Sequence, residues 1–78
     1  MPTVLRIGHW RFHFYSDEGL EPPHIHVDCG DGECKFWLQP VRLARSENVA
    51  AFEVRRIERE VATRQAFFLE QYHAFFHR

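Results

Sequence analysis

Two histidines at alternate positions, His24 and His26, are the residues of this chain best suited to chemistry. They lie in the segment 21–27, which reads Glu-Pro-Pro-His-Ile-His-Val. Alternate side chains of a strand point to the same face, so both imidazoles would share one surface. Imidazole changes charge near neutral pH and binds metals well, so the pair suits proton transfer, metal ligation or contact with phosphate. The alternative is that the two rings only form hydrogen bonds around the proline corner.

The residues before this segment predict a β-hairpin. Apolar side chains alternate through residues 3–7 and again through residues 10–14, with Gly8 and His9 between them. Glycine at the first position of a two-residue turn suits the type II′ geometry. The cross-strand pairs predicted by this turn are Ile7 with Trp10, Arg6 with Arg11, Leu5 with Phe12, and Val4 with His13.

A second hairpin is predicted around Gly30 and Asp31, with the two histidines in its first strand. Its register separates polar from apolar side chains, and a slip of one residue would send every side chain to the wrong face. Asp28 would face Glu33, a pair of like charges that is unfavourable unless a cation or an arginine lies between them. The other predicted pairs are Val27 with Cys34, Ile25 with Phe36, His26 with Lys35, and His24 with Trp37.

The last third of the chain predicts one long amphipathic helix over about residues 51–77. Val41 and Leu43 fit a short fifth strand after the four strands of the hairpins. A small antiparallel sheet, over about residues 3–44, must bury its apolar face against the helix, which predicts an α+β fold in a single domain of residues 1–78. The apolar helix positions at steps of three or four are Val54, Ile57, Val61, Gln65, Phe68, Tyr72 and Phe76.

The sheet face away from the helix is predicted to be uncovered and to carry cationic and aromatic side chains. His24, His26 and Lys35 could supply the acid, the base and the cation for metal-independent cleavage of RNA. The remaining side chains could hold the phosphate backbone or stack on bases. The simpler alternative is a polar, solvated sheet face. The predicted nucleic-acid-binding residues are Arg6, Arg11, His13, Tyr15 and Trp37.

A metal site is the second interpretation of the same face. His24, His26 and Asp28 could hold zinc or iron, although ligands two apart on a strand point too nearly parallel to converge unaided. The leading interpretation therefore needs no cofactor. Cys29 and Cys34 lack the Cys-x-x-Cys spacing common in zinc sites, so we expect free thiols and no disulfide.

Composition limits the class of protein. The 78 residues carry a net charge of −1, which argues against indiscriminate capture of nucleic acid. Lys35 is the only lysine, and this arginine bias favours forked contacts with phosphate or carboxylate. No apolar run approaches the roughly 18–20 residues that cross a membrane, and no signal peptide is recognisable, so we expect a cytoplasmic location.

Aromatic residues crowd the end of the predicted helix. Neighbours in sequence lie about 100° apart around a helix axis, so these rings cannot all face one thin sheet. Exposed aromatic surface commonly marks a protein partner or self-association, unless a curved sheet wraps around the helix. The predicted interface residues are Phe67, Phe75 and Phe76.

Four segments spread over almost the whole chain are specific in combination: 1–6, 21–27, 35–38, and 40–44 with the pairs Pro40-Val41 and Leu43-Ala44. Together they resemble the bacterial and archaeal family known as domain of unknown function 4160. The resemblance implies a small cytoplasmic protein encoded beside a cognate small protein, in a cassette similar to toxin–antitoxin pairs. It also implies that His24 and His26 are the functional positions. The leading interpretation is therefore a toxin-like component that binds, and could cleave, RNA.

Two residues depart from the pattern of that family. Ala50 stands where a serine or similar capping residue is expected, which predicts a looser start of the helix. Tyr72 stands where a tryptophan is expected, which predicts altered packing against a partner.

Overall fold

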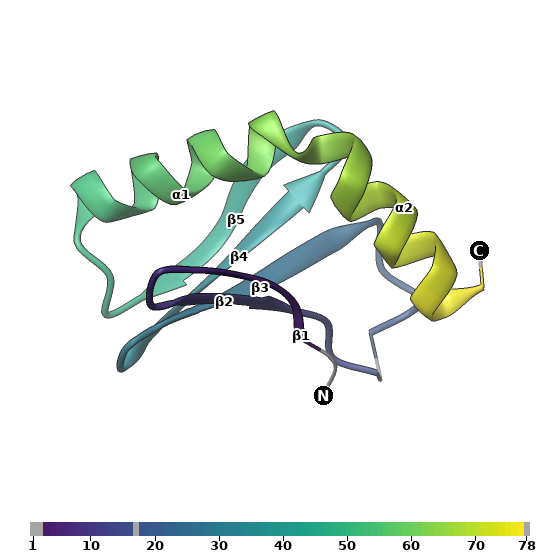
Figure 1. The fold of residues 1–78 in the computed structure, drawn as a ribbon, viewed down its shortest axis with the longest axis horizontal. Helices are drawn as coiled ribbons and strands as arrows, with labels where there is room; N and C mark the ends of the chain where they lie inside the picture. The colour runs from purple at the N-terminus through teal and green to yellow at the C-terminus, as the bar shows by residue number, and fades with distance from the viewer. Residues whose placement is uncertain (1–2, 17, 78) are drawn as a thin grey trace.

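The chain folds into two layers, a five-stranded antiparallel sheet and two helices that cover one of its faces (Figure 1). The strands follow chain order across the sheet, and the predicted α+β fold is confirmed with its fifth strand present. In chain order the elements are β1 (Thr3–Ile7), β2 (Trp10–His13), β3 (His24–Cys29), β4 (Gly32–Leu38), β5 (Val41–Glu47), α1 (Ala51–Thr63) and α2 (Gln65–Phe76).

The computed structural model describes residues 3–16 and 18–77. In these ranges neither helix is long and apolar enough to cross a membrane. Outside them lie four residues of the predicted domain: Met1, Pro2, Asp17 and Arg78.

Both hairpins have the predicted registers, with one exception. Every predicted pair of the second hairpin is present, and Asp28 faces Glu33. In the first hairpin the pairing of Val4 with His13 is wrong, because an irregularity in β1 places Thr3 opposite His13. An extra residue of this kind leaves one position of a strand unpaired and bends it.

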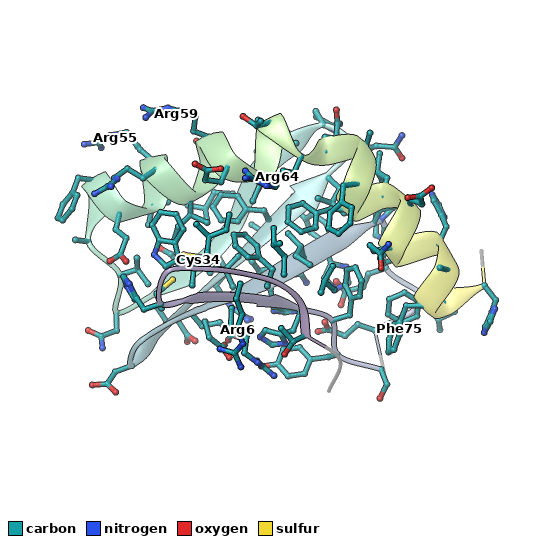
Figure 2. The ribbon with its side chains drawn as sticks, viewed as in Figure 1. Arg6, Cys34, Arg55, Arg59, Arg64 and Phe75 are labelled. Atoms are coloured by element: carbon teal, nitrogen blue, oxygen red, sulfur yellow. The ribbon has the colours of Figure 1, made fainter. Side chains whose placement is uncertain are left out.

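The apolar core lies between the sheet and the helices, as the alternation in the strands requires. Phe12 of β2 stacks on Phe68 of α2, with ring centroids 5.2 Å apart. Figure 2 shows Cys34 in this layer and Arg6 on the opposite side of the sheet. The buried core residues are Trp10, Phe12, Phe14, Ile25, Val27, Cys29, Cys34, Phe36 and Leu38 from the sheet side, and Ile57, Val61, Phe68 and Tyr72 from the helices.

The predicted single helix is two helices that meet at Arg64 (Figure 1). The backbone of Arg64, with φ −109° and ψ 24°, leaves the helical region. Before it, the hydroxyl of Thr63 donates to the carbonyl oxygen of Arg59 at 2.9 Å, a contact that often bends helices. After it, Gln65 Nε2 donates to the carbonyl oxygen of Leu38 at 2.6 Å, which ties the start of α2 to the end of β4.

The start of α1 lacks a side-chain cap, as the sequence predicts. Ala50 occupies the N-cap position, and no side chain there bonds to the first backbone amides. Glu53 is the acidic residue of the first turn, where a negative charge is favourable. Its carboxylate also accepts a hydrogen bond from Trp10 Nε1 at 2.7 Å, which joins α1 to β2.

Candidate metal centre

The histidines of the polar sheet face are buried, which corrects the expectation of an uncovered surface. The side chains of His13, His24 and His26 are at most 1% exposed, on the face away from the core. Two described residues of the connection between β2 and β3, Tyr15 and Glu18, contact these rings. Tyr15 from this connection packs against His26 with ring centroids 4.4 Å apart, and Glu18 contacts the rings through its carboxylate.

Glu18 brings His24 and His26 together at one point. Its Oε1 atom lies 2.9 Å from Nε2 of His24 and 2.6 Å from Nε2 of His26. The three ligand atoms all lie within 4.8 Å of one another. Sequence reasoning missed Glu18, because it placed this residue in an ordinary polar connection. The signal available was an acidic residue in a loop that leads directly into the His-x-His strand.

The proton positions on His24 follow from its two partners. Its Nδ1 atom lies 2.9 Å from the carbonyl oxygen of Pro22, and a carbonyl oxygen only accepts, so Nδ1 carries a hydrogen. In the neutral ring, Nε2 then presents a lone pair to the Glu18 oxygen. Two acceptor atoms 2.9 Å apart need a proton or a metal cation between them.

His26 faces two carboxylates through its two nitrogens. Nε2 contacts Glu18, while Nδ1 lies 3.6 Å from Oε2 of Glu33. Within residues 3–16 and 18–77, Nδ1 of this ring has no hydrogen-bond partner. Burial lowers the pKa of His26, although the nearby Glu18 acts in the opposite direction. Partial burial alone would raise the pKa of Glu18, but its hydrogen bonds with the two histidines outweigh this and the pKa is lowered.

Helix α2 anchors the loop that carries Glu18. The hydroxyl of Tyr72 donates to the carbonyl oxygen of Glu21 at 2.9 Å. Gly19 lies directly against Phe76, so closely that an added Cβ atom would come within 2.8 Å of the ring. Two residues that follow Glu18 in the loop are therefore held by α2, which explains how Glu18 can be kept over the histidines.

Of the aromatic residues predicted to bind a partner, two pack against the core and one stays exposed. Phe75 and Phe76 are partly buried and pack against Phe14, with ring centroids 5.6 and 6.0 Å away. Phe67 remains 38% exposed and Phe52 is exposed near the start of α1. Figure 2 shows Phe75 at the inner side of α2. Less aromatic surface is left for a partner at the helix end than the sequence suggested.

The side chains predicted to hold RNA lie together on the polar face, but carboxylates already contact them. Arg11 donates to Asp28 at 2.6 Å, and Lys35 donates to Glu21 at 2.5 Å. The Lys35 ammonium also lies over the ring of Trp37, 4.7 Å from its centroid. The remaining members of the predicted set are Tyr15, which donates to Glu33 at 2.7 Å, His13, which lies 3.1 Å from Asp28, and Arg6, which is exposed.

The metal interpretation predicted that Asp28 would lie with His24 and His26, and this prediction is wrong. The carboxylate of Asp28 instead lies beside His13 and Glu33, in a separate group. The reason is the cross-strand pairing, which places Arg11 opposite Asp28 and draws the carboxylate toward β2. Glu18 takes the place predicted for Asp28.

The cysteines are not part of this site. Cys29 and Cys34 are free and buried on the core side of the sheet, as predicted. Burial raises the pKa of Cys29 to about 12. A thiol in this state is a poor nucleophile and a poor metal ligand near neutral pH.

Comparison with known proteins places the chain in a family. No curated protein and no solved structure matches it. The family described as Domain of unknown function (DUF4160) matches residues 10–73. The matched region begins at β2 and contains Glu18, His24 and His26. On this match, which covers most of its length, the chain belongs to the DUF4160 family.

Proposed function

We propose that the protein binds a divalent transition metal ion through Glu18, His24 and His26. The proposal rests on one observation: Nε2 of His24 and Nε2 of His26 both contact the same oxygen of Glu18. Because His24 already donates from Nδ1, its Nε2 atom has no hydrogen to donate in the neutral ring. A metal ion between the three groups would accept the Nε2 lone pair of His24, which otherwise faces the Glu18 oxygen. Two histidines and one carboxylate form a ligand set used by zinc and by non-haem iron(II).

The outer hydrogen bond of His24 supports the same proposal. A histidine that ligates a metal usually donates its other ring N–H to a backbone carbonyl or a carboxylate, which fixes the ring. His24 has such a partner in the carbonyl oxygen of Pro22. For His26 the nearest carboxylate on that side is Glu33, 3.6 Å from Nδ1.

Three protein ligands leave room in the coordination sphere for water or a substrate. Structural zinc sites usually have four protein ligands, whereas catalytic sites keep one position open. The Glu18 side chain is 25% exposed, so solvent reaches the centre from the loop side. A water molecule bound there would lose a proton more easily than bulk water and become a nucleophile for hydrolysis.

Direct binding of RNA phosphate is the less favourable use of this face. Of the cations expected to contact phosphate, Arg11 and Lys35 already contact Asp28 and Glu21, and Arg6 is exposed. The carboxylates nearby, including Glu18, would repel a phosphodiester. A cytoplasmic, RNA-directed toxin with a cognate protein partner stays a prediction from the family resemblance.

Glu18→Gln tests the proposed ligand set. The substitution keeps the size of the side chain but removes its charge and its strength as a metal ligand. We expect the affinity for zinc to fall by more than the roughly 10- to 100-fold that loss of an outer hydrogen-bond partner costs. Isothermal titration calorimetry of chelator-treated protein without a histidine tag measures this change.

Glu70→Gln is the matched control, because Glu70 is an exposed carboxylate on α2, outside the three proposed ligands. This variant should bind zinc within a few-fold of the wild type. Equal affinities of the wild type and Glu18→Gln would contradict the proposal, and would leave a second proton on His24 as the explanation of the contact with Glu18.

A further inference from the structure

A second group of metal-ligating side chains lies beside the first, on the same sheet face. Asp28 and Glu33 face each other directly across β3 and β4. Like charges opposed in this way are unfavourable unless cations lie beside them. Here Arg11 contacts Oδ2 of Asp28 at 2.6 Å and Arg45 contacts Oε1 of Glu33 at 3.5 Å, which leaves Oδ1 of Asp28 and Oε2 of Glu33 on the side of His13. His13 Nε2 lies 3.1 Å from Oδ1 of Asp28 and 4.0 Å from Oε2 of Glu33, and the three ligand atoms all lie within 4.8 Å of one another.

These separations suit a single metal ion. Nitrogen and oxygen ligands lie roughly 2.0–2.2 Å from zinc, so in a tetrahedral site they are about 3.4 Å apart. The His13 side chain is fully buried, while Asp28 and Glu33 retain partial exposure. A small rotation of the two carboxylates toward the fixed ring would bring all three groups to bonding distance of one ion.

The carboxylates of this group have outer partners that would orient them. Arg11 holds Oδ2 of Asp28 at 2.6 Å, which leaves Oδ1 directed toward His13. Tyr15 donates to Oε2 of Glu33 at 2.7 Å, and this hydrogen bond raises the pKa of Tyr15 to about 12, so the hydroxyl keeps its proton. Hydrogen bonds of this kind fix the carboxylates that ligate metals.

A buried nitrogen of His26 also faces the second group. Its side chain is 1% exposed, and its Nδ1 atom has no hydrogen-bond partner among the described residues although it faces Oε2 of Glu33 at 3.6 Å. The other nitrogen of the same ring contacts Glu18. The ring therefore lies between the two groups, with one nitrogen directed to each.

We infer that His13, Asp28 and Glu33 form a second divalent-cation position, adjacent to the one at Glu18, so that the sheet face holds a two-metal centre. The inference rests on the proposed function, because it extends the same centre from one ion to two. Paired metal ions are used to bind and activate water and to stabilise both the attacking and the leaving oxygen in hydrolysis of phosphate esters and peptides. In such a centre Glu33 would ligate the second ion and also accept the Nδ1 hydrogen of His26.

The number of tightly bound zinc ions tests this inference. We expect the tag-free wild type to bind two zinc ions per chain in equilibrium dialysis followed by elemental analysis. Asp28→Asn and Glu18→Gln should each bind one ion. Asp31→Asn, a substitution of the same type in the adjacent exposed turn, should still bind two. If Asp28→Asn fails to fold, as judged by its circular dichroism, His13→Gln replaces it as the variant of the second position.

The outcomes separate this inference from the proposed function. One zinc ion in the wild type that is lost in Glu18→Gln and kept in Asp28→Asn would overturn the second position and leave the first in place. One ion that is kept in Glu18→Gln and lost in Asp28→Asn would support the second position and contradict the first. No tightly bound zinc in the wild type would overturn both.

Discussion

Saturating zinc will raise the midpoint of thermal unfolding of the tag-free protein by roughly 10 °C or more. A ligand that binds only the folded state at about 100 times its dissociation constant stabilises that state by about 2.7 kcal/mol. For a domain of this size, each kcal/mol shifts the midpoint by roughly 4–8 °C. Circular dichroism of chelator-treated protein, with and without added zinc, measures the shift.

His24→Gln should lose the part of this stabilisation that comes from the ion at Glu18, because it removes one proposed ligand and keeps a hydrogen-bonding side chain at the buried position. The matched control is His73→Gln, which changes an exposed histidine on α2 and should keep the full response. A zinc-induced shift of the same size in His24→Gln would show that other groups bind the metal.

Phe68→Ala will remove about 3–5 kcal/mol from the free energy of unfolding. The ring is fully buried and stacks on Phe12, so its loss opens a cavity between α2 and β2. A domain of 78 residues is stable by roughly 4–12 kcal/mol in total, so this variant should lose a quarter or more of its stability. Urea denaturation followed by linear extrapolation measures the difference.

The neighbouring residue offers the control for that experiment. Phe67 has the same chemistry but is 38% exposed, so Phe67→Ala should change the free energy of unfolding by less than about 1 kcal/mol. Equal losses in the two variants would mean that α2 does not pack on the sheet through Phe68. A large loss in Phe67→Ala alone would mean that Phe67, and not Phe68, packs against the sheet.

The sheet was predictable because each of its features has a local cause in the sequence. Gly8 and Gly30 have φ of 58° and 60°, a region that glycine adopts without steric cost, and each opens a two-residue turn. From these turns the alternation of polar and apolar residues determines the register. Two irregularities were not predicted, one at Val4 and one between Lys35 and Phe36 where β4 pairs with β5, because the alternation of polar and apolar residues gives no sign of either.

The break between the helices was not predictable from the same kind of pattern. Val61, Gln65 and Phe68 continue the helical period across Arg64, so the sequence reads as one uninterrupted helix. The bend depends on contacts made in three dimensions, such as the hydrogen bond from Gln65 to Leu38. The period of the apolar residues does not predict such contacts.

The sequence predicted the two histidines of the candidate site but not its carboxylate. Strand alternation placed His24 and His26 on one face, which the structure confirms. Glu18 belongs to a loop, where no period relates a residue to the strand that it will cover. Its position depends on the packing of Gly19 against Phe76 at the far end of the chain.

Anomalous X-ray diffraction from crystals grown with zinc, recorded at the zinc absorption edge, tests the metal centre most directly. We predict an anomalous peak about 2.0–2.2 Å from Nε2 of both His24 and His26 and from a carboxylate oxygen of Glu18. Zinc found only at exposed histidines such as His9 or His77, with no peak between those three side chains, would contradict the assignment.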